Sequence, residues 1–316
     1  AARSHIEVIN PVIREALTRA QCSWNDIDAI AVTYAPGLVG SLLVGTLAAR
    51  TLAILRDKPL YAIHHVEAHV YANFITESNG SALQLPSKQP EFPLLALIVS
   101  GGHTQLVLFH GHGDYELLGQ TQDDAVGEAF DKVAKILGLP YPGGPSIAAA
   151  ARHGDPEKYH LPKAKLDNPY NFSFSGLKTA VLRAVQHAVG KDFTFPSHEL
   201  PKLINDVQRA DFAASFQRVA VETLVERTLR AYSDFAPRSV VIAGGVAANQ
   251  ELRRQLSARL PIAIEYAPMQ FCTDNAAMIA TLGFFHTQYG IPADPYTLDV
   301  IPSLSMVNTA WNSAKV

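Results

Sequence analysis

The stretch Lys58-Pro59-Leu60-Tyr61-Ala62-Ile63 runs without a break into His64-His65-Val66-Glu67-Ala68-His69-Val70. The first part is short and apolar, which predicts a strand, and the second part is expected to be a helix. Successive helical side chains rotate by about 100°, so His65 and His69 should lie one turn apart on one face. That spacing lets two imidazoles bind one metal ion.

The histidine pair needs a third ligand from elsewhere in the chain, because two imidazoles leave a metal ion under-coordinated. A carboxylate would suit iron or zinc held with positions open for substrate. The alternative is a half-buried helix whose histidines are hydrogen-bonded core or surface residues. In zinc-protease helices the glutamate directly follows the first histidine, so the position of Glu67 argues against that class.

The chain before this stretch has the same order of strand and helix. Asp26–Thr33 is expected to be a strand, Pro36-Gly37 ends it, and Leu38–Leu55 is expected to be a glycine-containing helix. Strand, helix, strand, helix predicts a parallel α/β layer with short connections.

A loop and a glycine turn follow. Glu77–Pro93 is rich in proline, serine and glycine and is expected to be a loop at a lobe boundary. Leu94–Val99 and Thr104–Phe109 are apolar runs that predict a hairpin. The turn Ser100–His103 could bring backbone N–H groups close to a phosphate or carbonyl oxygen, although most such turns only reverse the chain.

Asp123–Gly138 is expected to be an amphipathic helix with acids capping its start and Gly138 at its end. Asp131 adjoins the buried stripe of this helix and is expected either to pair with Lys135 on the surface or to face a ligand hydroxyl. Tyr141–Pro145 follows as a rigid glycine turn that could also contact a ligand through its backbone.

The second half of the chain has a further glycine turn after a strand. Ser239–Ala243 is expected to be a strand, followed by Gly244-Gly245 and a helix through Leu260, an arrangement that places the turn where nucleotides usually bind. Asp274 precedes another helix and fits an N-cap. Further helices are expected at Phe172–Val189, Gln208–Phe235 and Ala276–Tyr289.

Composition sets limits on function. The chain has 316 residues, 48% of them hydrophobic and 17% charged, which is enough to bury a sizeable core in two lobes. The formal net charge of -3 excludes a general basic field, so any contact with RNA must be local, for example in the basic loop Lys158–Tyr170. Two cysteines cannot form a disulfide framework, and the apolar run Gly37–Ala49 is too short to span a membrane. We therefore expect a cytoplasmic protein with no membrane partner.

Seven motifs together resemble the bacterial TsaD family of tRNA N6-adenosine threonylcarbamoyltransferases, over Ala1 to about Gly290. The resemblance implies an α/β fold of the actin-like, sugar-kinase and Hsp70 type (ASKHA), with two ribonuclease-H-like lobes and a ligand cleft between them. We expect a first lobe of residues 1–92, completed by 276–316, and a second lobe of residues 93–275. The motifs are His64–His69, Ser100–Thr104, Gly127–Lys132, Tyr141–Pro145, Phe172–Lys178, Ala243–Asn249 and Cys272–Asn275.

The resemblance also implies the site residues. His65, His69 and Asp274 would bind one metal ion per chain, Fe2+ or alternatively Zn2+, and no catalytic base is assigned. The glycine turns would hold a phosphate, Asp131 the ribose hydroxyls and Asn249 an adenine edge. The implied substrate contacts are Ile98, Val99, Ser100, Gly101, Gly102, Asp131, Gly144 and Asn249.

The implied reaction is a metal-dependent acyl transfer in tRNA processing. Threonylcarbamoyl-AMP would give its threonylcarbamoyl group to N6 of the adenosine next to the anticodon, in tRNAs that read codons beginning with A. TsaB-like and TsaE-like proteins are the expected partners, with a local contribution to tRNA binding from Lys158, Lys163 and Lys165.

Three alternatives come from other classes. They are a metalloprotease of the glycoprotease type, an actin-like ATPase or sugar kinase, and a non-catalytic scaffold like TsaB. The position of Glu67 argues against the protease, and the metal histidines argue against the scaffold. A first phosphate loop, which a kinase would need, is not visible. The family begins with a strand-turn-strand segment that is not seen here, so we expect the natural protein to begin upstream of Ala1.

Overall fold

The computed structural model describes residues 2–76, 85–264 and 266–308. The loop expected over Glu77–Pro93 lies partly outside these residues. The chain divides into two compact units, each with its own sheet. Unit 1 comprises Ala1–Gln89, Gly111–Tyr115 and Asp274–Val316, and unit 2 comprises Pro90–His110 and Glu116–Thr273.

Unit 1 contains two parallel strands. The strands pair in parallel with Ile30 opposite Leu60, as the alternation of strand and helix predicts. Its elements are α1 (Ala2–Arg19), η1 (Trp24–Asp26), β1 (Ile30–Ala35), α2 (Val39–Arg56), β2 (Leu60–His64), α3 (His65–Tyr71), η2 (Ala72–Phe74), α10 (Ala276–Tyr289) and η5 (Met306–Asn308).

Strand β1 begins later than predicted. Asp26 was expected inside the strand, but it closes a capping box with Ser23 and ends the short helix η1. The Asp26 carboxylate accepts hydrogen bonds from the Ser23 backbone N–H and hydroxyl, so the residue is committed to a turn.

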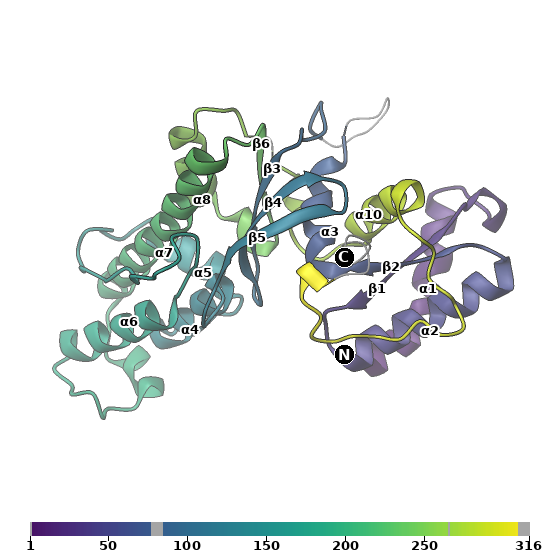
Figure 1. The fold of residues 1–316 in the computed structure, drawn as a ribbon. Helices are drawn as coiled ribbons and strands as arrows, with labels where there is room; N and C mark the ends of the chain where they lie inside the picture. Colours follow the sequence, from purple (N-terminus) through teal and green to yellow (C-terminus); the bar gives the residue numbers. More distant parts are fainter. Residues whose placement is uncertain (1, 77–84, 265, 309–316) are drawn as a thin grey trace. The chain divides into compact units, whose positions relative to one another are not determined.

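Helices α2 and α10 cover opposite faces of the unit 1 sheet (Figure 1). A Cβ added to Gly283 of α10 would lie 2.6 Å from the Ala31 Cβ, whereas one added to Gly45 of α2 would lie 3.9 Å from Val32 Cγ2. Neighbouring side chains of a strand point to opposite faces, so these two approaches come from opposite sides. The two-stranded sheet is thus enclosed between helices.

Helix α2 is long and apolar enough to cross a membrane by length and composition. Only 22% of this helix is buried, on the face where Ala49 and Ala53 join a hydrophobic cluster with Leu60, and a single helix of this kind is weak evidence for a membrane span. Arg50 of the same helix donates to the carbonyls of Pro295 and Leu298. These contacts bind α2 to the rest of unit 1.

Unit 2 is built on a sheet of order β5-β4-β3-β6, whose last strand β6 runs parallel to β3. Strands β3 and β4 form the predicted antiparallel hairpin. Strand β5 was not predicted, because polar residues interrupt its alternation. The strands are β3 (Leu94–Val99), β4 (Thr104–Gly111), β5 (Asp114–Gln120) and β6 (Ser239–Ala243), and the helices are α4 (Val126–Leu137), α5 (Gly143–Ala151), α6 (Ser175–Ala188), η3 (Ser197–Lys202), α7 (Asp206–Phe235), η4 (Gly245–Ala248), α8 (Gln250–Arg259) and α9 (Met269–Cys272).

The core of unit 2 lies between one face of this sheet and its helices (Figure 1). Leu95, Leu97 and Val99 of β3 enter the same buried cluster as Phe130 of α4 and Phe216 of α7. The last two rings meet edge to face with centroids 5.0 Å apart. Such aromatic pairs bury large apolar areas, which anchors α4 and α7 to each other beneath the sheet.

The acids before α4 do not cap it, in contrast to the prediction. The Asp123 carboxylate instead accepts hydrogen bonds from the backbone N–H groups of Phe174 and Ser175, at the start of α6. The first N–H of α4, on Val126, donates to the Thr104 hydroxyl at 2.9 Å. The C-terminal prediction is confirmed, because Gly138 adopts the left-handed conformation there.

An irregular segment, residues 155–171, is attached along one side of α7. Asp211 of α7 accepts from the Asp155 backbone N–H at 2.8 Å, and the Tyr159 ring stacks on Phe212 with centroids 3.8 Å apart. Nearer the end of the helix, Arg227 donates to the carbonyl of Asn171 at 2.8 Å. We call residues 155–171 the strap.

Candidate metal site and glycine turns

The change from strand to helix at His64 positions α3, which carries two of the candidate metal ligands. His64 is the N-cap of α3, and its Nδ1 accepts from the Glu67 backbone N–H at 3.5 Å. The predicted helix therefore begins at His65, and His65 and His69 follow one turn apart. Their ring centroids lie 4.8 Å from each other.

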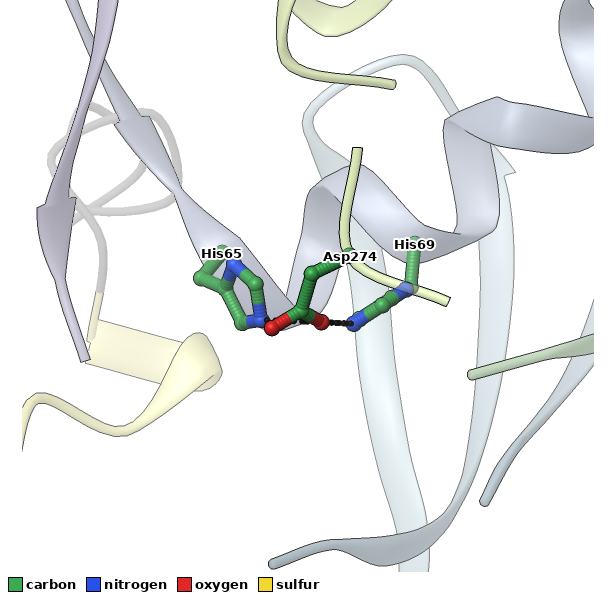
Figure 2. Close-up of side chains that lie close together, drawn as sticks. All are labelled: His65, His69 and Asp274. Atoms are coloured by element: carbon green, nitrogen blue, oxygen red, sulfur yellow. Dashed lines mark ion pairs between the residues drawn. The ribbon is translucent and has the colours of Figure 1, made fainter. Parts of the chain in front are cut away.

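Asp274 is not the N-cap of α10, because its neighbour takes that position. The N-cap of α10 is Asn275, whose Oδ1 accepts from the Met278 backbone N–H at 2.9 Å. The reading of Asp274 as an N-cap is therefore wrong. Its Oδ1 lies 3.3 Å from Nε2 of His65 and 3.3 Å from Nε2 of His69 (Figure 2). Hydrogen bonds to His65 and then His69 hold the pKa of the Asp274 carboxyl well below its usual range.

The spacing of these donor atoms fits a bound metal ion. One ligand atom from each of the three residues lies within 4.8 Å of the other two. Donors bound at about 2.1 Å with tetrahedral angles are separated by roughly 3.4 Å, close to the 3.3 Å observed between oxygen and each nitrogen. The Asp274 side chain is 80% exposed and that of His65 26%, which leaves access for further ligands.

Glu67 lies on the same helix as the histidines but is removed from solvent. Its residue exposure is 1%, and the Tyr115 hydroxyl lies 3.2 Å from its Oε2. Burial raises the pKa of the Glu67 carboxyl to about 8, since a charge there would lose its hydration. A buried, protonated carboxyl is poorly suited to act as the general base of a metalloprotease.

The Ser100–His103 turn closes on its own serine. The Ser100 hydroxyl accepts from the backbone N–H groups of Gly102 at 3.3 Å and His103 at 3.1 Å. The side chains of Ile98 and Val99 are fully buried in β3. Of these predicted contact residues, Ile98 and Val99 could therefore reach a ligand only through their main chains.

Two glycines, Gly127 and Gly244, let separate segments lie close to this turn. A Cβ on Gly127 of α4 would lie 2.6 Å from the Ser100 carbonyl oxygen. One on Gly244, which has a φ of +90°, would lie 2.5 Å from the Val99 carbonyl oxygen. Only glycine allows the backbone to approach so closely, so the start of α4 and the turn after β6 both adjoin the end of β3.

Asp131 has a partner that was not predicted. Its Oδ1 accepts from the Gly143 backbone N–H at 2.7 Å. Asp131 therefore does not pair with Lys135, and one of its two carboxylate oxygens already has a partner. Gly143 begins α5, which shows that the expected rigid turn is the first turn of a helix. A Cβ on Gly144 would meet no atom within 4 Å, so the backbone is open at this predicted contact residue.

Asn249 is the N-cap of α8, a role that the sequence reading missed. Its Oδ1 accepts from the Leu252 backbone N–H at 3.0 Å, and its Nδ2 donates to Gln217 Oε1 at 3.1 Å. Asparagine directly before a helix is itself a capping signal. One hydrogen of the Asn249 amide remains for an additional partner.

A sequence model of the family described as "TsaD: tRNA N6-adenosine threonylcarbamoyltransferase" matches residues 1–281. The chain belongs to the TsaD family. A tRNA N6-adenosine threonylcarbamoyltransferase of Symbiobacterium thermophilum is 51% identical over 97% of this chain and 84% of its own length. The protein of the same name from Thermomicrobium roseum is 49% identical over 97% of this chain and 85% of its length. TsaD membership favours the transferase over the protease, kinase and scaffold alternatives.

Solved structures of HypF share the fold. Full-length HypF in the phosphate- and nucleotide-bound form has a TM-score of 0.55 over 87% of this chain and 41% of that chain, at 13% identity. HypF of T. kodakarensis has a TM-score of 0.58 over 86% of this chain and 43% of that chain, at 14% identity. These values support the ASKHA-type α/β fold expected for TsaD proteins.

Proposed function

We propose that the chain transfers the threonylcarbamoyl group of threonylcarbamoyl-AMP to N6 of the adenosine next to the anticodon, in tRNAs that read codons beginning with A. Family membership over residues 1–281 supports the reaction class. The observation that carries the proposal for this chain is the proximity of the possible metal-ligand atoms of His65, His69 and Asp274, which lie within 4.8 Å of one another.

We propose that these three residues hold one divalent ion, Fe2+ or alternatively Zn2+. Two imidazoles and one carboxylate with open positions form a ligand set typical of non-haem Fe2+, and the same donors also bind Zn2+. When bound, the ion would supply Lewis-acid polarisation of the carbamoyl carbonyl. The buried His69 fixes one ligand in the protein interior, whereas the exposed Asp274 leaves one side accessible.

A transfer assay with metal analysis tests this proposal. His65→Ala and Asp274→Ala should each lose stoichiometric metal and at least 100-fold in the rate of threonylcarbamoyl transfer, because only two ligands remain. His198→Ala is the matched control, since His198 is an exposed histidine in unit 2 outside the proposed site. Full metal content in both ligand variants would show that the ion is bound elsewhere.

We further propose that the adenylate binds in unit 2, along the end of β3. The segments 98–102, 143–144 and 244–249 support it, because Gly127 and Gly244 adjoin the Ser100 turn and Asp131 fixes the start of α5. Helix starts and glycine turns present N–H groups to phosphates. Asp131 is proposed to bind ribose with Oδ2, since Oδ1 already accepts from Gly143.

Calorimetry with a non-hydrolysable adenylate can separate binding from folding. Gly102→Ala and Gly144→Ala add a methyl group where the protein has no atom within 4 Å. Weaker binding in these variants would therefore result from a clash of the methyl group with the ligand and not from a change in the protein. Gly111→Ala is the control, because its position is equally open but lies outside the proposed site. For Asn249, replacement by serine keeps a capping oxygen and removes only the amide donor. Unchanged affinity in all three site variants would show that the adenylate binds elsewhere.

Binding of tRNA is proposed to depend on TsaB-like and TsaE-like partners, because a chain with a net charge of -3 offers few phosphate contacts. Of the three predicted lysines, Lys163 is an unsuitable contact, since its ammonium group pairs with Glu222 at 2.8 Å and Glu226 at 2.6 Å. Lys158 and Lys165 are exposed on the strap and remain the proposed local contribution. We also propose that the enzyme acts in the cytoplasm.

A further inference from the structure

A short C-terminal segment of unit 1 contacts the helix that carries the metal histidines. The Leu304 carbonyl oxygen lies 3.0 Å from Nε2 of His64, and the Met306 carbonyl oxygen lies 2.9 Å from the Tyr115 hydroxyl. His64 and the segment itself belong to unit 1. Tyr115 lies at the start of β5, in the part Gly111–Tyr115 that is also grouped with unit 1, whereas the rest of β5 belongs to unit 2. Residues 304–306 lie beyond residues 1–281, which the TsaD sequence model matches.

The contact at His64 fixes the state of its imidazole ring. A carbonyl oxygen can only accept, so Nε2 carries the hydrogen and donates to Leu304. Nδ1 is then the acceptor, which agrees with the Glu67 backbone N–H directed at it. His64 is 2% exposed, and its ring connects the C-terminal segment to the first turn of α3.

The contact at Tyr115 makes a second connection to the same helix. The hydroxyl lies 3.2 Å from Glu67 Oε2 as well as 2.9 Å from the Met306 carbonyl oxygen. Tyr115, Glu67 and Met306 are all at least 94% buried. Buried hydrogen bonds of this kind are costly to break, because the separated groups have no water to bind.

We propose that the segment Leu304–Met306 is a clamp that positions α3 for metal binding, with His64 and Tyr115 as its positioning residues. The proposal rests on the proposed metal site. Helix α3 has only seven residues, too few to hold its own geometry, so its orientation depends on contacts to neighbours. Both anchors on the segment are main-chain carbonyls, so the clamp depends on the path of the chain more than on its side chains.

The position of the clamp suits this role. His64 directly precedes the ligand His65, and Glu67 lies between the ligands His65 and His69. A displacement of either contact therefore moves both imidazoles relative to Asp274, which is supplied by another segment. Residues that orient metal ligands typically change metal affinity by 10–100-fold when they are replaced.

Titration of the full chain with Zn2+, followed by Co2+ absorption spectra, tests the clamp without an activity assay. Tyr115→Phe removes only the hydroxyl and should weaken Zn2+ binding about 10-fold, as should His64→Leu. His64→Gln keeps an N–H donor at the place of Nε2 and should restore part of the affinity. The ligand-field bands of Co2+ should shift in Tyr115→Phe, which a loss of overall stability alone would not produce.

Tyr170→Phe is the matched control, because it also removes a tyrosine hydroxyl hydrogen bond, to Asp234 in unit 2. Its Zn2+ affinity and Co2+ spectrum should equal those of the unmodified chain. Unchanged affinity and spectra in Tyr115→Phe and His64→Leu, with binding lost in His65→Ala, would overturn the clamp and leave the metal site standing. Failure of the unmodified chain to bind one Zn2+ would overturn both.

Discussion

Replacement of Gly127 by alanine should loosen the glycine turn from α4. The new Cβ would lie 2.6 Å from the Ser100 carbonyl oxygen and 2.9 Å from Gly101 Cα, and it must move by about 0.4 Å to reach 3.0 Å from the oxygen. All of these neighbours are backbone atoms, so no flexible side chain can yield. The Gly127 backbone N–H donates to the same oxygen at 3.2 Å, so that bond weakens as well.

The size of the effect follows from three contributions. Overpacking costs about 1–3 kcal/mol. The weakened hydrogen bond costs about 1 kcal/mol. Alanine in place of glycine stabilises a helix by about 1 kcal/mol, which offsets part of this loss. We therefore expect Gly127→Ala to lower the stability of unit 2 by about 2 kcal/mol, equivalent to roughly 30-fold faster amide exchange.

Hydrogen exchange of α4 and β3 peptides is the suitable assay, because it reports on these elements directly and unit 2 contains no tryptophan among its described residues. Gly102→Ala serves as the comparison, since its Cβ would meet no atom within 4 Å and should leave exchange unchanged. Exchange in Gly127→Ala that matches the unmodified chain would refute the reasoning from close approach.

Three further perturbations have defined outcomes. Burial lowers the pKa of His286 to about 4, so between pH 6.5 and pH 4 this histidine is protonated in the unfolded chain but neutral in the folded chain. The free energy of unfolding is therefore highest above pH 6.5 and falls by up to about 3 kcal/mol toward pH 4. His286→Phe should abolish most of this loss when the urea midpoint is followed by tryptophan fluorescence from pH 7 to 4.5, and an identical pH dependence in the variant would contradict it. Asp123→Ala should destabilise α6 by about 2 kcal/mol, seen as faster exchange in that helix, because the variant removes the cap at Phe174 and Ser175. Lys163→Ala should cost less than about 1 kcal/mol in a urea melt and leave the salt dependence of tRNA affinity unchanged, whereas a clear drop in that dependence would show that the lysine leaves its glutamates to bind phosphate.

The sequence predicted the local elements well because their signals lie within a few residues. The β3–β4 hairpin and the left-handed cap at Gly138 follow from neighbouring residues, and the parallel pair β1–β2 follows from the alternation of strand and helix. The errors arose where a residue had two local possibilities. Asp123 could cap the helix that follows it or reach another segment, and only tertiary structure places it at α6, about fifty residues away.

The same limit applies to the candidate site. Spacing alone indicates that His65 and His69 share a face, but Asp274 was named from family resemblance, and its position left a capping role open. The structure gives that role to Asn275. Asp131 illustrates the opposite case, since its contact with Gly143 joins two helices and has no signal in either segment.

The strap has a consequence for proteolysis. Residues 155–171 form no regular helix or strand, yet Asp211, Phe212 and Arg227 of α7 hold them from end to end. A protease must draw a stretch of chain into its active site, and here that requires release from α7 first. Trypsin should therefore cut after Lys158 and Lys165 at a rate that follows the opening of unit 2, so that irregular backbone becomes a sensitive reporter of stability.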